Sequence, residues 1–121
     1  MKVIIAGTRS VKDYGLVVQA VQRSGYDITE VVSGCATGVD WLGEQWARAN
    51  GIPVKEMPAD WNTYGKSAGP QRNRAMAEYA DAAVIIWDGE SRGTRNMIEN
   101  MVRRKKPYYI GMTSTTLEDF V

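Results

Sequence analysis

Short apolar runs alternate along the chain with segments whose apolar residues recur at helical spacing. The runs are rich in β-branched residues and flanked by glycine or polar residues, as in buried parallel strands; they lie at 2–6, 29–33, 53–57, 83–87 and 107–110. Four helices are expected between them. Asp13 is predicted to cap the first helix and Gly25 to end it, and Gly51 is predicted to end the second.

Pro70 is expected in the first turn of the third helix, and the fourth carries Met97 and Met101 at apolar positions. Strands that alternate with helices in this way predict one α/β domain over residues 1–121. We expect a Rossmann-like, doubly wound, mainly parallel five-stranded sheet, with strand order 3-2-1-4-5 and helices on both faces. The segment 113–121 shows no clear pattern.

Composition narrows the possible functions. Lys and Arg number 15 against 14 Asp and Glu, so no overall positive field attracts nucleic acid, and we do not expect it as a partner. No apolar run approaches the roughly 20 residues that cross a bilayer, and Cys35 is the single cysteine, so we expect a cytoplasmic protein without membrane contact. Histidine is absent, which excludes Ser-His-Asp catalysis and histidine metal sites. No metal or cofactor is expected to be required.

Small and polar residues follow the first, second and fourth predicted strands. Taken singly, each group also fits an ordinary turn or a capped helix start, and none matches a named phosphate motif. The carboxyl ends of these strands meet at the switch point of the sheet, where ligands bind. Their joint position therefore predicts a phosphate site at Gly7, Thr8, Arg9, Ser33, Gly34, Gly38, Asp40, Ser91, Arg92, Gly93 and Thr94.

Two further stretches have residues suited to a ligand site. Residues 58–69 are predicted to form a long loop, on which Trp61 and Tyr64 are candidates to cover a base. Arg72, Asn73 and Arg74 are predicted to lie in the first turn of a helix; positive charge is unfavourable there, which indicates a function for Arg72 and Asn73 in ligand binding.

Other unusual side chains have a structural interpretation. The basic run 103–106 is predicted to stabilise a helix C-terminus rather than to bind DNA. Cys35 is predicted to be a small packed residue, and Trp41, Trp46 and Trp87 are predicted to lie mostly in the core. Met97 and Met101 are interpreted as exposed and available for a homodimer interface.

Several segments together resemble a known family. They are Val3–Arg9, Val31–Asp40, Pro58–Trp61, Gly69–Met76 and Ser91–Glu99. In combination they resemble the YspA-type branch of the SLOG superfamily, a Rossmann-like group that includes the Lonely Guy phosphoribohydrolases and is similar to the DprA core. The resemblance implies binding of a nucleotide or a nucleotide-derived signal, with its phosphate near Gly93 and Thr94. Dimers or higher homo-oligomers are common among related proteins.

The hydrolases of this superfamily pair an arginine before the fourth strand with a glutamate three residues after the Gly-Thr pair. Arg72 falls at the first place, but Met97 occupies the second. Glu99 lies two positions further on, which is about 200° around a helix. The weak catalytic candidates are therefore Arg72, Asp88, Asp40 and Glu99.

Three functions remain open. The first is a module that senses, carries or sequesters a phosphate-bearing nucleotide or nucleotide-derived small molecule. The second is an N-glycosidic hydrolase of nucleoside 5′-monophosphates. The third is nucleic-acid processing of the DprA type, which the near-neutral charge disfavours.

Overall fold

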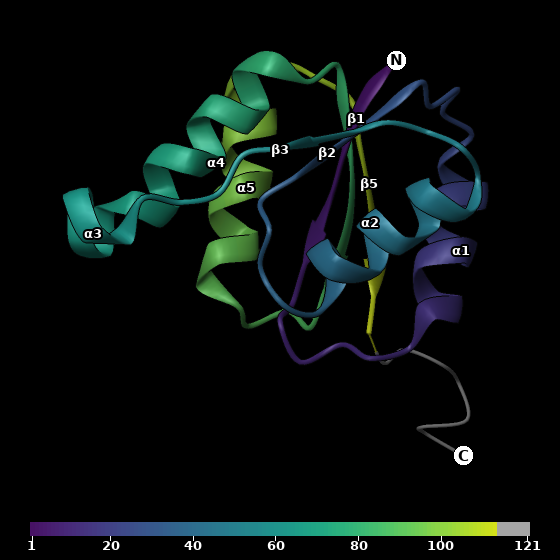
Figure 1. The fold of residues 1–121 in the computed structure, drawn as a ribbon, viewed down its shortest axis with the longest axis horizontal. Helices are drawn as coiled ribbons and strands as arrows, with labels where there is room; N and C mark the ends of the chain where they lie inside the picture. Colours follow the sequence, from purple (N-terminus) through teal and green to yellow (C-terminus); the bar gives the residue numbers. More distant parts are fainter. Residues whose placement is uncertain (114–121) are drawn as a thin grey trace.

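A computed structural model of the chain describes residues 1–113; residues 114–121, most of the segment without a clear pattern, lie outside the described residues. Strands and helices alternate from the N-terminus (Figure 1). The elements are β1 (Lys2–Gly7), α1 (Tyr14–Ser24), β2 (Glu30–Ser33), α2 (Val39–Ala49), β3 (Val54–Glu56), α3 (Trp61–Tyr64), the 3₁₀ turn η1 (Gly65–Ser67), α4 (Ala68–Tyr79), β4 (Ala82–Trp87), α5 (Arg92–Arg103) and β5 (Tyr108–Met112).

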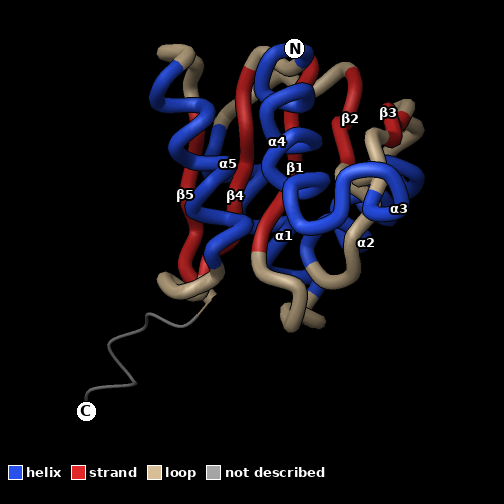
Figure 2. The backbone as a smooth tube through the Cα atoms, turned by 90° about the vertical axis from the view of Figure 1, so that its left-hand side faces the viewer, coloured by secondary structure: helices blue, strands red, loops and turns tan. Residues whose placement is uncertain are grey.

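The strands form one parallel sheet in the order β3-β2-β1-β4-β5, as predicted (Figure 2). Its centre is the pair β1 and β4, in register from Val3 opposite Ala82 to Gly7 opposite Ile86. The order reverses between these two strands, because β2 and β3 lie on one side of β1 and β5 lies beyond β4. Their carboxyl ends meet at the lower edge of the sheet in Figure 1.

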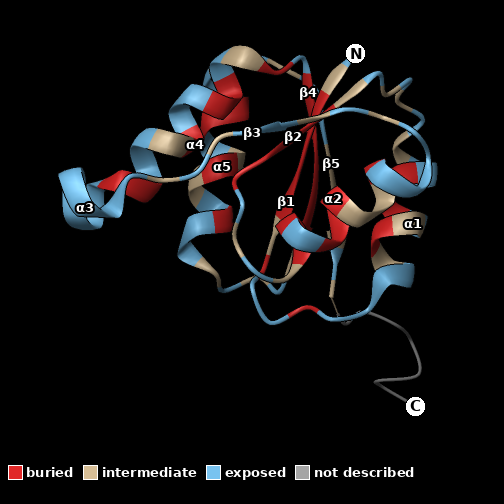
Figure 3. Ribbon diagram, in the orientation of Figure 1, coloured by how far each residue is buried: buried red, intermediate tan, exposed pale blue. Residues whose placement is uncertain are grey.

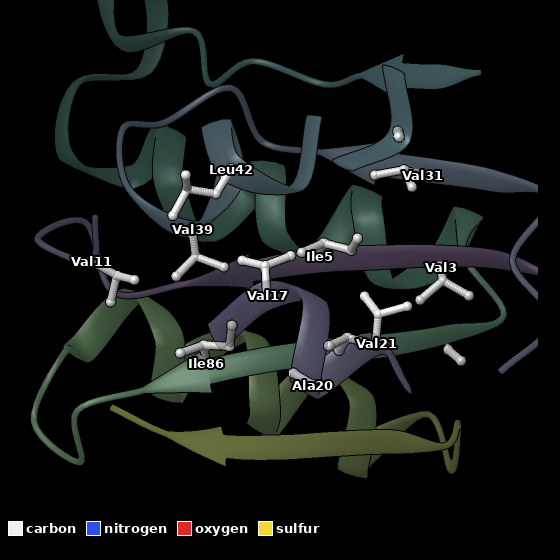
Figure 4. Packing of buried hydrophobic residues seen from close by; sticks show 13 residues of the cluster. Val3, Ile5, Val11, Val17, Ala20, Val21, Val31, Val39, Leu42 and Ile86 are labelled. Atoms are coloured by element: carbon white, nitrogen blue, oxygen red, sulfur yellow. The ribbon is translucent and has the colours of Figure 1, made fainter. Parts of the chain in front are cut away.

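Successive residues of a strand point to opposite faces of the sheet, so a hydrophobic core forms on each face. In β1, Val3 and Ile5 pack against α1 and α2, whereas Ile4 and Ala6 pack against α4 and α5. Figure 3 shows β1 and β4 buried between these two helical layers. In the first core, drawn in Figure 4, Val17 of α1 lies beside Ile5, and Val39 of α2 belongs to the same cluster.

Local signals in the sequence set the bounds of α1. The Asp13 carboxylate accepts a hydrogen bond from the Gly15 amide at the start of the helix, and Gly25 ends it in the left-handed conformation at φ 71°. Both features are confirmed as predicted. Within residues 1–113 no helix is both long and apolar enough to cross a bilayer.

The structure corrects predictions about the loops and α4. The stretch predicted as a long loop contains α3 and η1, because Asp60 accepts a hydrogen bond from the Thr63 amide and so caps a short helical turn. Helix α4 begins at Ala68, two residues before Pro70, so Arg72 and Arg74 lie beyond its first turn. The prediction that these arginines lie in the first turn and oppose the helix dipole is therefore wrong.

The burial of four side chains also differs from prediction. Trp41 is 53% exposed, because it lies on the outer face of α2, and Cys35 is exposed in the loop before that helix. Met97 and Met101 are buried, because they form the face of α5 that packs on β1 and β4. The two methionines therefore offer no exposed interface.

Candidate functional site

A pocket lies at the switch point of the sheet, between the carboxyl ends of β1 and β4. Its cavity has a volume of about 60 Å³. Predicted site residues from every one of the three loops line it, together with residues of α4. The lining residues are Ala6, Gly7, Arg9, Ala36, Asp40, Arg72, Asn73, Met76, Ser91, Gly93, Thr94 and Met97. The structure thus brings together eight of the predicted residues, Gly7, Arg9, Asp40, Arg72, Asn73, Ser91, Gly93 and Thr94.

The loop after β1 is held tightly against β4. A Cβ at Gly7 would lie 2.0 Å from the carbonyl oxygen of Ile86, so only glycine fits there. Thr8 is buried; its amide donates to the Ile86 carbonyl at 3.0 Å, and its hydroxyl oxygen accepts from the Asp88 amide at 3.1 Å. The hydroxyl of Thr8 therefore fixes two loops to each other and lies behind the pocket, while Arg9 reaches its wall.

The loop after β2 is built on a buried hydroxyl. Ser33 is fully buried and donates from Oγ to the Glu44 carboxylate at 2.6 Å, while it accepts from the Cys35 amide at 3.1 Å. The structure corrects its assignment as a ligand contact, because both bonds go to the protein. Gly38 begins α2 at φ 75°, where a Cβ would lie 2.4 Å from the Arg9 carbonyl oxygen, so it too supports the pocket from outside.

Cys35 lies within this loop, in surroundings that disfavour its thiolate form. Partial burial of its sulfur, together with the carboxylates of Glu44 and Glu56, raises the pKa of its thiol. A thiol needs a lowered pKa to react at neutral pH. Cys35 does not line the pocket at the switch point.

Arg72 connects α4 to the loop after β2. Its Nη1 donates to the Gly34 carbonyl at 2.5 Å, and its Nε donates to Asn73 Oδ1 at 3.0 Å. Gly34 is buried beneath it, since a Cβ there would lie 2.6 Å from Arg72 Nη1 and 2.9 Å from Asp40 Oδ2. Burial lowers the pKa of Arg72, but a guanidinium stays charged at neutral pH. The pocket therefore contains a fixed positive charge.

Asn73 joins α4 to the start of α5. From Nδ2 it donates to the Gly93 carbonyl at 3.1 Å and to Asn96 Oδ1 at 3.0 Å. It is buried, and it also accepts the bond from Arg72. One amide side chain thus sets the position of the arginine relative to the N-terminus of α5.

The N-terminus of α5 forms part of the wall of the pocket. Ser91 caps the helix and accepts from the Thr94 hydroxyl at 3.1 Å and from the Thr94 amide at 3.5 Å. In the described part of the chain, the amides of Arg92 and Gly93 have no hydrogen-bond acceptor. Free amides and the positive end of the helix dipole favour an anion at this position.

Of the three candidate carboxylates, the pocket contains one. Asp40 is 5% exposed, and burial raises its pKa, although the Ala36 amide and Arg72 offset part of the effect. Asp88 instead accepts hydrogen bonds from the Ser91 and Glu90 amides at 2.8 Å, which lower its pKa. Glu99 is exposed and does not line the pocket, whereas Met97 does. Asp88 and Glu99 do not belong to the pocket lining.

A groove of about 250 Å³ continues from the pocket toward α3. Arg9, Arg72, Asn73 and Gly93 line both cavities, and the groove adds Arg92 and Trp61. The Trp61 ring packs close to Gly69, the second residue of α4, where a Cβ would lie 3.1 Å from the ring. Of the two aromatic side chains predicted to cover a base, Trp61 lines the groove, whereas Tyr64 is exposed and does not line it.

Some lining residues were not predicted from the sequence. Ala6, Met76 and Met97 form the apolar floor, and Asn96 lies at the edge of the groove. Their positions at the ends of core elements look like ordinary packing in the sequence. In residues 1–113 no group of acidic or cysteine side chains is arranged to hold a metal ion.

These features define a Rossmann-like α/β fold with a polar pocket at its switch point. The model of the YspA, cpYpsA-related SLOG family matches residues 1–64, and the chain belongs to this family. Gene 61 protein of Mycobacterium phage D29 is 37% identical over 105 residues, which are 78% of this chain and 83% of that protein.

Among solved structures, DNA processing protein A (DprA) from Streptococcus pneumoniae has the same fold, with a TM-score of 0.70 and 18% identity over 98% of this chain. The chain spans about half of DprA, because the match covers 52% of that protein. This likeness shows the fold, and the family membership predicted from the sequence is confirmed.

Proposed function

We propose that the chain binds a nucleotide or nucleotide-derived ligand through its phosphate. The observation that supports this most directly is the junction of two cationic side chains, Arg9 and Arg72, with the free amides at the N-terminus of α5. Charged donors and helix amides are the usual partners of a phosphate. Among residues 1–113, Asp40 is the only acidic side chain in the pocket lining, so the net charge of this lining favours an anion.

The sizes of the two cavities indicate which part of the ligand each of them would hold. About 60 Å³ suits a compact group such as a phosphate, whereas pockets for whole small molecules measure about 300–1,000 Å³. The sugar would then lie where the two cavities join, in contact with the pocket lining, and the base would extend into the groove beside Trp61. An indole face is a suitable platform for a base, because stacking needs only an accessible aromatic surface.

A thermal-shift titration with nucleoside monophosphates, nucleosides and inorganic phosphate tests this proposal. Nucleotides should raise the melting temperature of the wild-type chain, because a ligand that binds only the folded state stabilises it. Arg9→Ala and Thr94→Val should reduce the shift. Arg23→Ala is the matched control, since Arg23 lies in the last turn of α1 outside both cavities. Equal shifts for nucleosides and nucleotides would refute a phosphate site.

Hydrolysis of nucleoside 5′-monophosphates is a second candidate, supported by one observation. Arg72 and Asp40 line the same pocket, so a cation and a carboxylate are available beside a bound sugar phosphate. A carboxylate can stabilise the oxocarbenium charge that develops as an N-glycosidic bond breaks. Release of free base by the wild-type chain, lost in Asp40→Asn, would establish this activity; intact nucleotide after prolonged incubation would leave binding alone.

A further inference from the structure

Asp40 has one carboxylate oxygen without a partner. Its Oδ2 accepts from the Ala36 amide at 3.2 Å, but within residues 1–113 no donor reaches Oδ1. Every fully enclosed side-chain nitrogen or oxygen in that part of the chain has a hydrogen-bond partner. Oδ1 is therefore not fully enclosed, and since Asp40 is 95% buried and lines the pocket, the pocket is its route to a partner.

The position of Asp40 in α2 accounts for only one of its two carboxylate oxygens. It lies in the first turn of the helix, where a negative charge is favourable, and Oδ2 holds the preceding loop. An asparagine would supply the same acceptor to Ala36 without the cost of burying a charge. The remaining oxygen has no structural role among the described residues, although leaving a buried acceptor without a partner is unfavourable.

The pocket therefore offers two kinds of partner to a ligand. The N-terminus of α5 and the arginines supply hydrogen-bond donors and positive charge, and the Asp40 carboxylate of α2 supplies an acceptor. A bare phosphate satisfies only the donors, because it has no hydrogen to donate once fully ionised. A ligand that carries both an anionic group and a hydroxyl satisfies the donors and the acceptor.

We propose, on the basis of the proposed phosphate site, that Asp40 accepts a hydrogen bond from a ribose hydroxyl of the bound nucleotide. Asp40 would then be a specificity-determining residue that selects ribosyl phosphates over their deoxyribosyl counterparts. Sites built to bond a hydroxyl reject the analogue that lacks it, because the buried acceptor is left unpaired. One hydrogen bond to a charged group makes a difference of about tenfold or more in affinity.

Calorimetric titration of the wild-type chain with AMP, 2′-deoxy-AMP and 3′-deoxy-AMP tests the inference without any mutation. At least one deoxy analogue should bind about tenfold more weakly than AMP. Ribose 5-phosphate and 2-deoxyribose 5-phosphate repeat the comparison without a base. If AMP and both deoxy analogues bind equally well, Asp40 does not recognise a ribose hydroxyl, although the proposal of a phosphate site stands. If no phosphate compound binds, the proposed function itself fails.

Asp40→Asn assigns the preference to this residue. It keeps an acceptor for Ala36, so the fold should persist, and it should bind AMP and the discriminated deoxy analogue within about threefold of each other. Glu99→Gln removes an exposed carboxylate outside the pocket and should discriminate like the wild type. Undiminished discrimination in Asp40→Asn would overturn the assignment.

Discussion

Arg72 on α4 donates from Nη1 to the carbonyl oxygen of Gly34, at 2.5 Å, and so fastens a helix from one face of the sheet to the loop that follows β2. The contact requires that residue 34 have no side chain. It also holds the guanidinium beside Asp40, so that the cation and the carboxylate of the pocket depend on one glycine. A substitution at Gly34 should therefore alter the geometry of the site more than the stability of the fold.

Gly34→Ala should weaken nucleotide binding at least tenfold, or about 1.4 kcal/mol, with a modest loss of stability. The new Cβ would displace the end of the flexible Arg72 side chain, at a cost of about 0.5–1.5 kcal/mol for an unfavourable rotamer. Gly7→Ala is the contrasting variant, because its Cβ would meet the backbone at Ile86. Urea unfolding and calorimetry of both variants should show that Gly34→Ala loses nucleotide affinity while it keeps most of its stability, whereas Gly7→Ala loses stability as well. Unchanged binding in Gly34→Ala would contradict the assigned role of Arg72.

Asn73→Ala should lower the free energy of unfolding by about 1–3 kcal/mol, because it leaves buried partners of a hydrogen-bond network unsatisfied. The side chain makes bonds to Arg72, Gly93 and Asn96. Asn50→Ala removes a single exposed bond to the Trp46 carbonyl and should cost less than about 1 kcal/mol. Urea unfolding measures both changes. Similar values for the two variants would show that Asn73 does not join α4 and α5 energetically.

Lys106→Met should destabilise the chain by about 1–3 kcal/mol, whereas Lys105→Met should change it by less than about 0.5 kcal/mol. Lys106 Nζ donates to the carbonyls of Ala77, Glu78 and Ala80 and so satisfies the C-terminus of α4. Lys105 is exposed, and no hydrogen bond of its ammonium group joins it to the described residues. Thermal unfolding of the pair distinguishes a structural lysine from a solvated one. A larger loss in Lys105→Met would reverse the assignment.

Asp40→Asn should gain stability relative to the wild type as the pH rises. Burial raises the pKa of Asp40 in the folded chain, so the folded state holds this proton more tightly than the unfolded state does. The stabilising contribution of the neutral carboxyl is complete below the unfolded pKa of about 3.9 and is lost as the pH rises through the folded value. Urea unfolding of both chains at about pH 3 and about pH 7 should show the variant improving; a relative loss at about pH 7 would contradict the raised pKa.

The sheet and its switch point could be predicted because each signal is local. Apolar runs such as 83–87 contain β-branched residues, and Asp13 and Gly25 bound a helix by their own backbone chemistry. The short helix at Trp61–Tyr64 could not be predicted from periodicity, since one turn has none; Asp60 as its cap was the available signal. Trp41 was misplaced for a related reason, because residue type alone does not say which face of α2 it occupies.

The candidate site was predictable at the level of its loops rather than of its side chains. Gly34 and Gly38 are predicted to approach the ligand, but they accommodate Arg72 and Arg9, respectively, and do not line the pocket. Gly7 does line it, yet the lack of a side chain there is required by the Ile86 backbone. Ser33 was expected to face a phosphate, yet its hydroxyl is bound to Glu44 eleven residues away. Such pairings depend on tertiary contacts, which spacing along the chain does not contain.

The most direct test of the central claim is calorimetric titration of the wild-type chain and Arg9→Ala with a nucleoside 5′-monophosphate and its nucleoside. Arg9 lines both the pocket and the groove, and no other described side chain binds its guanidinium. Measurable binding of the nucleotide, with affinity reduced at least about tenfold by loss of the phosphate or of Arg9, is the predicted result. Equal affinity for nucleotide and nucleoside, or for wild type and variant, would contradict a phosphate site between β1 and β4.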